Sequence, residues 1–151
     1  MKCLVTGGAG FIGSHIVGKL LENNHHVVVI DNESSEANDV FNWYEDDAEN
    51  HVVDIRDFDA CRPLFEGVDY VFHLAAHSRI QLAMQRPKEC LETNYFGTYN
   101  MLECARQAGV SRFVNSSTSS SYGLLNKPPL QEDMKTDCLN PYSASKVGAE
   151  T

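Results

Sequence analysis

The chain has 151 residues, of which 42% are hydrophobic and 22% are charged, so it can form one globular domain with its own core. Its formal net charge of −9 argues against a nucleic-acid backbone as partner, and no apolar run approaches the roughly 20 residues that span a membrane. Five scattered cysteines without a C-x-x-C pair, and an N-terminus that lacks a signal peptide, predict a protein of the reducing cytoplasm without a disulfide scaffold or zinc site.

A glycine-rich stretch, Gly7 to Gly13, follows the apolar residues 3–5 and precedes apolar residues at helical spacing. This order predicts a strand, a tight turn and a helix. We expect Gly7 to tolerate a positive φ, Gly10 to let the backbone approach a diphosphate, and Gly13 to let the helix pack closely on the strand. The first N–H groups of the helix would then face the phosphates. An ordinary strand–turn–helix that is rich in glycine is the alternative.

The next apolar run, residues 27–30, consists of β-branched residues and ends in Asp31. Such a run predicts a parallel strand that is buried on both faces. A carboxylate at its tip can accept hydrogen bonds from both hydroxyls of an adenosine ribose, and it would repel a 2′-phosphate. Because no Lys or Arg occurs from Leu20 to Ile55, we expect NAD rather than NADP. The alternative is that Asp31 is a solvated turn residue.

The polar and acidic segment 32–50 predicts a loop with a short helix, in which Phe41, Trp43 and Tyr44 form a packing cluster. A third strand is expected at residues 51–55, where Asp54-Ile55 could flank an adenine ring.

A fourth strand is expected at residues 68–74. The small residues Ala75 and Ala76 that follow it would let a cofactor lie against the backbone. His73 and His77 bracket the end of this strand, so their four-residue spacing does not place them on one face, and we expect no metal site.

Residues 79–108 predict a helix that is interrupted near Pro87, because proline fits the first turn of a helix. Gly109 is expected to end this helix as a C-cap. Asn94 is a polar residue among apolar neighbours, as a satisfied core amide would be. Five other residues recur at helical spacing: Leu91, Tyr95, Thr98, Leu102 and Ala105.

Residues 112–115 predict a fifth strand, which ends in the hydroxyl-rich block 116–123. Open α/β sheets bind ligands beyond the carboxyl ends of their strands, so these hydroxyls are expected to face a cofactor or substrate. Further along, Pro141 begins a helix that carries Tyr142 and Lys146 on one face. An ammonium beside a phenol favours the deprotonated phenol, which is a usable base. Two surface residues of an amphipathic helix would show the same spacing.

Strands alternate with helices along the chain, which predicts an α/β fold with a doubly wound parallel sheet. Here the chain resembles the extended short-chain dehydrogenase/reductase family, specifically its NAD-dependent sugar-nucleotide epimerase and dehydratase branch. The resemblance covers essentially all 151 residues and implies a Rossmann-type sheet that is incomplete at the C-terminus. The matching blocks are Thr6–Gly13, Asp31-Asn32, Asp54-Ile55, His73–Ala76, Asn94 with Gly97-Thr98, residues 116–123, and Pro141–Lys146.

The resemblance implies roles for individual residues. Tyr142 would be the general base, Lys146 would hold the nicotinamide ribose and tune Tyr142, and Thr118 would hydrogen-bond the substrate hydroxyl. The implied cofactor-binding residues are Gly7, Gly10, Phe11, Ile12, Gly13, Asp31, Asn32, Asp54, Ile55, Leu74, Ala75, Ala76, Asn94, Ser116, Tyr142 and Lys146.

Dehydratases of this family typically have an acid after the threonine, because elimination of water needs an acid and a base at neighbouring carbons. Here Ser119 and Ser120 follow Thr118, which favours a UDP-sugar 4-epimerase that uses NAD and passes through a 4-keto intermediate. A nucleotide-sugar 4,6-dehydratase or reductase, and a non-catalytic NAD-binding module, are the alternatives.

Members of this family are roughly twice as long, as a two-part enzyme needs. The resemblance therefore implies that residues 1–151 are an NAD-binding domain without the part that grips the nucleotide sugar. We expect this chain to bind NAD weakly and to turn over a UDP-sugar poorly, if at all, by itself. The resemblance implies a homodimer for a full-length protein and leaves the oligomeric state of this chain open.

Overall fold

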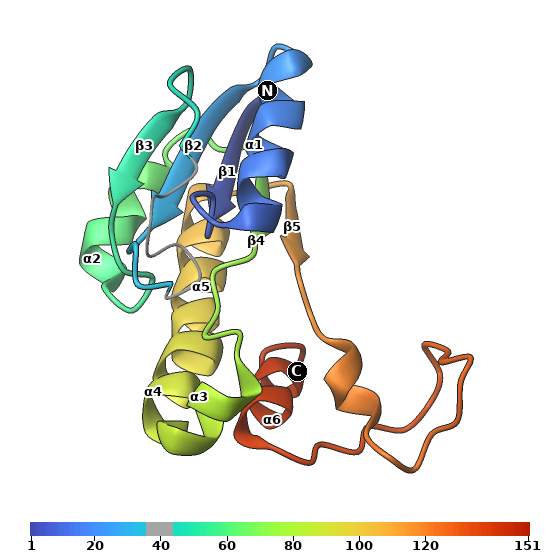
Figure 1. Ribbon diagram of the computed structural model, residues 1–151. Helices are drawn as coiled ribbons and strands as arrows, with labels where there is room; N and C mark the ends of the chain where they lie inside the picture. The colour runs from blue at the N-terminus through green and yellow to red at the C-terminus, as the bar shows by residue number, and fades with distance from the viewer. Residues whose placement is uncertain (36–43) are drawn as a thin grey trace. The chain divides into compact units, whose positions relative to one another are not determined.

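Figure 1 shows the computed structural model, which describes residues 1–35 and 44–151. The chain divides into two compact units. Unit 1 comprises Met1–Ala75 and Gly97–Ser116, and unit 2 comprises Ala76–Phe96 and Ser117–Thr151.

Unit 1 is built on a parallel sheet, which confirms the predicted fold class. Its strands are β1 (Lys2–Thr6), β2 (His26–Asp31), β3 (Glu49–Val52), β4 (Tyr70–His73) and β5 (Arg112–Asn115). They lie in the order β3-β2-β1-β4-β5, and every neighbouring pair is parallel. The strand order therefore reverses at β1, the strand that leads into the glycine-rich turn, and doubly wound sheets bind ligands at such a switch.

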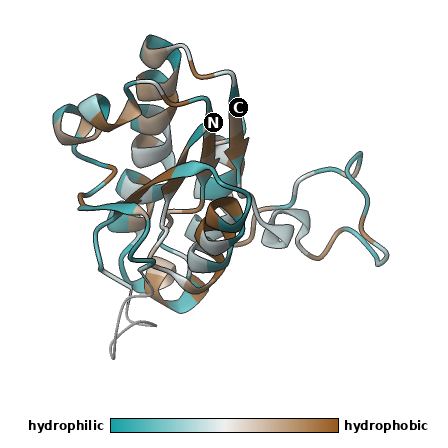
Figure 2. Cartoon of the chain, turned by 90° about the horizontal axis from the view of Figure 1, so that it is seen from above, coloured by the Kyte–Doolittle hydropathy of each residue, from teal (hydrophilic) through white to brown (hydrophobic). Residues whose placement is uncertain are grey.

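Helices cover both faces of this sheet. On one face, α1 (Phe11–Glu22) packs through Val17 against Val5 and Val29. On the other face lie α2 (Phe58–Cys61), the 3₁₀ helix η2 (Arg62–Phe65) and α5 (Thr98–Ala108), around a second apolar cluster. Figure 2 shows the hydrophobic residues concentrated on the strands between these helices. The β-branched run of β2 is buried because it meets a helix on each side.

Two of these helices begin or end at residues that favour a helix end by their own chemistry. Asp57 caps α2 by accepting a hydrogen bond from the Ala60 N–H at 3.0 Å, and Gly109 ends α5 with a φ of 70°. Of the expected aromatic cluster, Tyr44 packs on the apolar cluster beneath α1, whereas Phe41 and Trp43 lie outside the described residues.

The third strand ends earlier than the sequence predicts. Pairing stops where Val52 meets Asp31, the last residue of β2. The Asp54 carboxylate accepts a hydrogen bond from the Arg56 N–H at 2.8 Å, which turns the chain away from the sheet. Asp54 and Ile55 therefore lie in the turn after β3 and not within the strand.

The long helical region divides into α3 (Ile80–Gln85), α4 (Pro87–Leu91), the π-helical segment η3 (Glu92–Gly97) and α5. Pro87 begins α4, as predicted. The spacing noted in the sequence marks the buried face only in part, because Thr98 and Ala105 are buried whereas Leu91, Tyr95 and Leu102 are each 42% exposed. The π-helical segment shifts the phase of the helix, and the buried face also includes Cys90, Asn94, Met101 and Cys104.

Unit 2 contains α3, α4, η3, the 3₁₀ helix η4 (Ser119–Tyr122) and α6 (Pro141–Gly148). Helix α6 packs against α3 and α4. Asn140 caps α6 in a reciprocal capping box with Ser143, so the start of this helix is fixed. Across the described ranges 1–35 and 44–151, no helix combines the length and apolarity that crossing a membrane requires.

Candidate functional site

The glycine-rich turn fits the expected steric roles in unit 1. Gly7 has a φ of +71°, and a Cβ there would lie 2.7 Å from the Ala75 nitrogen. A Cβ on Gly13 would overlap the Gly7 carbonyl oxygen, so α1 can approach the turn only with glycine at this position. Sequence reasoning did not single out Gly8, whose Cβ would lie 2.6 Å from Val29 Cγ1.

The start of α1 is open to a ligand. Gly10 occupies the N-cap position and therefore supplies no side-chain cap. A Cβ on Gly10 would meet only the Gly7 oxygen, at 3.3 Å. Phe11 and Ile12 are 64% and 62% exposed. An uncapped helix start next to a tight glycine turn is a geometry that suits a diphosphate.

Asp31 lies beside this turn and is half-buried, not a solvated turn residue. Its Oδ2 accepts a hydrogen bond from the Ala9 N–H at 3.1 Å, and its Oδ1 accepts one from the Glu33 N–H at 2.8 Å. Burial raises the pKa of Asp31, and these backbone hydrogen bonds oppose that rise. The carboxylate is thus held at the edge of the turn, and its remaining lone pairs can accept further hydrogen bonds.

Asn32 and Asp54 form a linked pair at the ends of β2 and β3. The Asn32 amide donates to Asp54 Oδ2 at 2.9 Å, and Arg56 Nη2 donates to the same oxygen at 2.7 Å. The hydrogen bonds from Arg56 lower the pKa of Asp54 to about 2. No local pattern signalled the position of Arg56, because its nearness to Asn32 depends on the pairing of β2 with β3. Ile55, the other expected adenine contact, is buried in the core.

A buried chain of side-chain hydrogen bonds lies under the end of β4. His73 Nδ1 is 2.7 Å from Thr6 Oγ1, and His73 Nε2 is 2.9 Å from Thr98 Oγ1. Thr6 Oγ1 also accepts a hydrogen bond from the Ala75 N–H at 3.2 Å. Leu74 and Ala75 are therefore tied to β1, directly before Gly7. Sequence reasoning missed the roles of both threonines, because the hydrogen bonds connect residues distant in the chain.

In unit 2, Asn94 is a fully buried amide with several partners. Its Oδ1 accepts a hydrogen bond from the His77 N–H at 2.7 Å, and its Nδ2 donates to Ser145 Oγ at 3.0 Å. Ser145 Oγ in turn donates to the Tyr142 carbonyl oxygen at 2.7 Å. Asn94 thus connects the segment that follows Ala76 with α6, the helix of Tyr142 and Lys146.

Helix α6 buries a lysine. Lys146 is only 2% exposed, and it lies one helical turn beyond the half-buried Tyr142. Burial lowers the pKa of Lys146, whereas the charge of Glu150 and the Cys90 sulfur act in the opposite direction. A buried lysine costs folding free energy, so its presence points to a functional requirement for an amine at this place.

Thr118 lies at the start of η4, in the same unit. Its Oγ1 accepts a hydrogen bond from the Ser120 N–H at 3.2 Å and lies 2.9 Å from Ser120 Oγ. The neighbouring Ser117 hydroxyl donates to the Glu150 carboxylate. In unit 1, Ser116 follows β5, and its N–H donates to the His73 carbonyl oxygen at 3.0 Å. The contacts given for Thr118 therefore lie within unit 2, and those given for Ser116 lie within unit 1.

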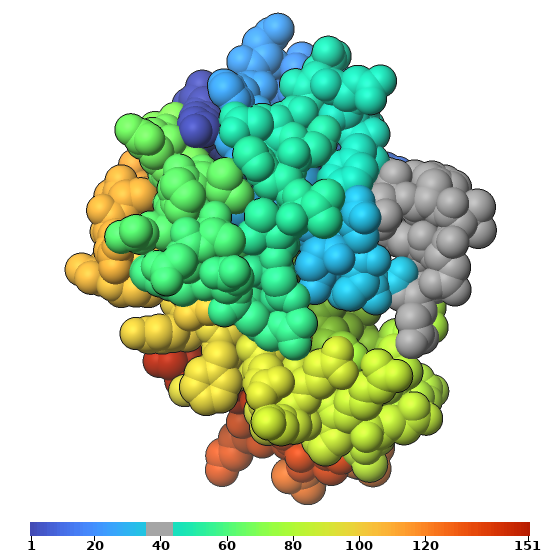
Figure 3. Space-filling view, turned by 90° about the vertical axis from the view of Figure 1, so that its left-hand side faces the viewer, coloured from blue at the N-terminus to red at the C-terminus, as the bar shows by residue number. Residues whose placement is uncertain are grey.

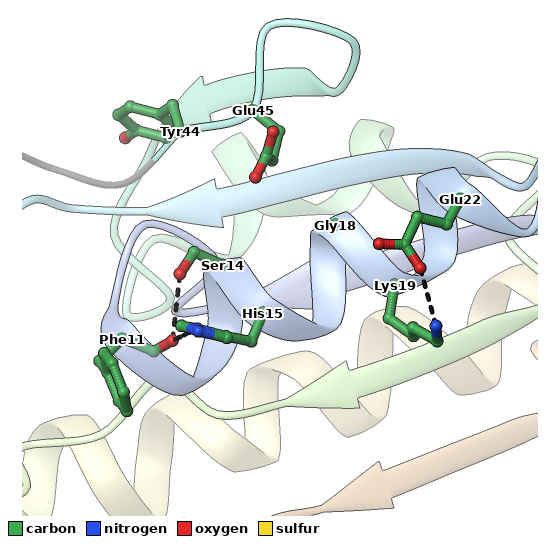
Figure 4. A pocket seen from close by; sticks show the side chains of 8 residues that line it. All are labelled: Phe11, Ser14, His15, Gly18, Lys19, Glu22, Tyr44 and Glu45. Carbon is green, nitrogen blue, oxygen red and sulfur yellow. Dashed lines mark hydrogen bonds and ion pairs between the residues drawn. The ribbon is translucent and has the colours of Figure 1, made fainter.

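A separate open pocket of about 680 Å³ borders α1 in unit 1 (Figure 4). The polar groups of α1 that line it bond mostly within the helix: Ser14 and His15 both contact the Phe11 carbonyl oxygen, and Lys19 pairs with Glu22. Figure 4 shows Tyr44 and Glu45 away from these groups, so the polar side chains that line the pocket do not point toward a common ligand position.

Residues 4–151 match the protein-family model described as GDP-mannose 4,6 dehydratase. A putative UDP-glucose 4-epimerase from Methanocaldococcus jannaschii is 39% identical over 150 residues, which cover 97% of this chain and 48% of that protein. The UDP-glucose 4-epimerase of Streptomyces lividans is 38% identical over a region that covers 99% of this chain and 45% of that protein.

Solved structures agree with these relatives. The UDP-glucose 4-epimerase of Thermotoga maritima, solved with UDP-glucose, superposes with a TM-score of 0.93 at 36% identity, over 99% of this chain and 49% of that one. The UDP-glucose 4-epimerase of Thermus thermophilus, in complex with NAD, gives a TM-score of 0.89 at 34% identity, with the same coverage. The chain thus spans about half the length of the relatives it matches.

Proposed function

Because the chain belongs to the family whose model is described as GDP-mannose 4,6 dehydratase, we propose that it binds NAD and carries the catalytic groups for epimerisation at C4 of a UDP-sugar. The relatives named as UDP-glucose 4-epimerases support this proposal. One observation carries the proposal: Lys146 is almost fully buried, one helical turn from Tyr142.

We assign the diphosphate and adenosine of NAD to residues of unit 1. The uncapped start of α1 with Gly7, Gly10, Phe11, Ile12 and Gly13 would hold the diphosphate. Asp31 and Asn32 would hold the adenosine ribose. Asp54 would flank the adenine together with the backbone of Ile55, whose side chain is buried in the core. The further assigned contacts are Leu74, Ala75 and Ser116 in unit 1, and Ala76, Asn94, Tyr142 and Lys146 in unit 2.

The reacting groups that we assign all belong to unit 2. The Tyr142 phenolate would accept the proton of the sugar hydroxyl at C4, and Thr118 would hydrogen-bond the same oxygen. The Lys146 ammonium would stabilise the phenolate and bind the ribose next to the nicotinamide. When bound, NAD supplies a hydride acceptor and donor for C4, so the sugar passes through a 4-keto form.

Loss of water is the competing reaction, because the matched family model is described as a 4,6-dehydratase. A dehydratase would need an acid and a base at adjacent carbons. Thr118 is followed by Ser119 and Ser120, and the Glu150 carboxylate bonds Ser117 instead of Thr118. These contacts favour epimerisation.

Titration of the 151-residue chain with NAD tests the cofactor assignment. We expect saturable binding that the Tyr142→Phe variant retains. The NMR amide signals of the turn from Gly7 to Gly13 should shift on addition of NAD. A chain that is folded and shows no response to NAD would overturn the cofactor assignment.

A chimera tests the reaction. Residues 1–151 would be joined to the remaining C-terminal part of the Thermotoga maritima UDP-glucose 4-epimerase and incubated with UDP-galactose. An equilibrating mixture of C4 epimers that Tyr142→Phe abolishes is the expected result. A 4-keto-6-deoxy product from a nucleotide sugar would instead identify a dehydratase. NAD binding without any turnover would indicate a binding module.

A further inference from the structure

One carboxylate in unit 2 connects the two parts of the chain that carry the assigned reacting groups. Glu150 accepts a hydrogen bond from the Ser117 hydroxyl, and Ser117 directly precedes Thr118. Within the described residues of unit 2, no other hydrogen bond connects residues 117–122 with residues 140–151. This bond is therefore the polar link between the Thr118 segment, residues 117–122, and the region of α6.

The chain keeps a helical path between Lys146 and Glu150. The Ala149 N–H donates to the Ser145 carbonyl oxygen at 3.1 Å. The Glu150 N–H then donates to the Val147 carbonyl oxygen at 3.0 Å. Side chains four residues apart on such a path are neighbours. Burial lowers the pKa of Lys146, and the negative charge of Glu150 opposes this change.

Few other charges act on the buried Lys146. Little of the red helix α6 is visible behind the yellow-green α3 and α4 (Figure 3), which pack against it. Helix α3 contains no titratable residue, and α4 contributes the Cys90 thiol. The other titratable residues of α4, η4 and α6 are not among the groups that act on Lys146: Lys88, Glu89, Tyr122 and Tyr142. Among the described residues, Glu150 is thus the carboxylate that favours the charged form of this lysine.

The position of Glu150 is unfavourable for the helix that precedes it. Helix α6 ends at Gly148, and the free carbonyl groups at a helix C-terminus give that end a partial negative charge. An acidic side chain just beyond this end therefore does not stabilise the helix. The hydrogen bond from Ser117 and the attraction to Lys146 offset this repulsion.

We propose that Glu150 is a positioning residue, which fixes the Thr118 segment beside α6 and keeps Lys146 in its ammonium form. This inference rests on the proposed roles of Thr118, Tyr142 and Lys146. An ammonium stabilises a Tyr142 phenolate, whereas a neutral amine does not. Glu150 acts through Ser117 and Lys146, so it needs no contact with a substrate.

The Glu150→Gln variant tests the effect on Lys146, because glutamine keeps the size and the acceptor oxygen of the side chain and removes its charge. Carbon-13 NMR of Lys146 Cε would follow the titration of the amine in the 151-residue chain. We expect the midpoint to lie at a lower pH in Glu150→Gln and to return towards that of the unaltered chain in Glu150→Asp. Glu132→Gln removes an exposed carboxylate from the same unit and should leave the midpoint unchanged.

The Ser117→Ala variant tests the effect on the Thr118 segment, because it removes the hydrogen bond and leaves the charge of Glu150. The amides of Ser120 and Ser121 bond to Thr118 within this segment and should exchange hydrogen about fivefold faster in the variant. The midpoint of Lys146 should move less than in Glu150→Gln. Ser111→Ala, at an exposed position in unit 1, is the control and should leave both exchange rates unchanged.

The chimera with the Thermotoga maritima enzyme connects these effects to turnover. In Glu150→Gln, kcat should fall about tenfold at about pH 9, and the loss should shrink at about pH 6, where Lys146 is charged with or without Glu150. A loss that is the same at both pH values would overturn the effect of the charge.

The outcomes separate this inference from the proposed function. An unchanged midpoint of Lys146 in Glu150→Gln, or exchange rates within twofold in Ser117→Ala, overturns the role of Glu150 while the proposed function stands. If the unaltered chimera does not turn over a UDP-sugar, the proposed reaction fails, and the role of Glu150 in that reaction fails with it. Circular dichroism establishes that each variant is folded, and Glu150→Ala replaces Glu150→Gln if the latter is not.

Discussion

Asn94 donates a 3.0 Å hydrogen bond from its side-chain amide to Ser145 Oγ, and so links the π-helical segment η3 to α6. Both side chains are buried. Because the Ser145 hydroxyl hydrogen is directed to the Tyr142 carbonyl oxygen, the Ser145 oxygen must accept the bond from Asn94. The position of α6, and with it that of Tyr142 and Lys146, therefore depends on a polar contact within unit 2.

Replacing Ser145 by alanine should lower the free energy of unfolding by about 1–2 kcal/mol, because Asn94 loses an acceptor inside the protein. The nearby Cys90 Sγ, 3.4 Å from Asn94 Nδ2, is a poorer acceptor and should not compensate. Urea denaturation measures the change. Ser111→Ala, at an exposed position, is the control and should be nearly neutral. Equal stability of the two variants would show that the Asn94–Ser145 bond does not stabilise the fold.

Lys146→Met should stabilise the folded chain at pH 7 by about 0.5–2 kcal/mol, although it removes a group assigned to catalysis. Burial lowers the pKa of Lys146 below 10.5, so between the folded and the unfolded pKa the unfolded chain binds more protons. The stability of the unaltered chain therefore rises with pH through that range, and the advantage of the variant should fade as pH approaches 10.5. Urea denaturation at about pH 7 and about pH 10 tests this expectation.

The control for this experiment is Lys88→Met, because Lys88 is exposed and its side chain is 89% accessible. It should change stability by less than about 0.5 kcal/mol at either pH. A destabilised Lys146→Met would mean that the attraction from Glu150 outweighs the cost of burial. In the chimera with the Thermotoga maritima enzyme, the same variant should lose epimerase activity.

Much of the fold could be predicted because its signals are local. Apolar β-branched runs mark β2, and Asp57, Gly109 and Pro141 mark ends of helices through their own backbone chemistry. Each signal acts within a few residues of its position in the chain. The order of the elements then restricts the topology to a parallel doubly wound sheet.

The contacts around the candidate site could be predicted only in part. Glycine turn chemistry is local, so Gly7 and Gly13 could be recognised from the sequence, whereas Gly8 is required by Val29 on a neighbouring strand. The nearness of Arg56 to Asn32 likewise depends on the register of β2 with β3. A turn of the π-helical segment contains one more residue than a turn of an α-helix, which changes which residues of the long helix are buried. The spacing of apolar residues in the sequence does not reveal such an insertion.

Alanine at Gly13 should destabilise the chain by about 2 kcal/mol or more, because its Cβ would overlap the Gly7 carbonyl oxygen. Alanine at Gly10 should change stability by no more than about 1 kcal/mol, since the nearest atom lies 3.3 Å from its Cβ. If Gly10 lets the diphosphate approach the backbone, that variant should still weaken NAD binding about tenfold. Thermal unfolding and NAD titration of both variants separate the two effects.

Gly18→Ala is the control for these two variants. Its Cβ would make an ordinary contact of 3.5 Å with Glu45 Oε1, and alanine favours a helix interior, so this variant should be as stable as the unaltered chain or more stable. NAD binding should not change. Unimpaired NAD binding by Gly10→Ala would remove Gly10 from the assigned diphosphate contacts.

We expect the ring of His73 to carry a proton on Nε2. Thr6 Oγ1 accepts the Ala75 N–H, and we expect its own hydroxyl hydrogen to donate to His73 Nδ1, which leaves the ring proton on Nε2. His73 Nε2 then donates to Thr98 Oγ1. His15 provides an internal contrast, because its Nδ1 lies 2.7 Å from the Phe11 carbonyl oxygen and must carry the proton. Nitrogen-15 NMR of the imidazole rings should therefore show opposite tautomers for the two histidines, and a protonated Nδ1 on His73 would show that Thr6 Oγ1 accepts from the ring, which refutes the expected direction of the Thr6–His73 bond.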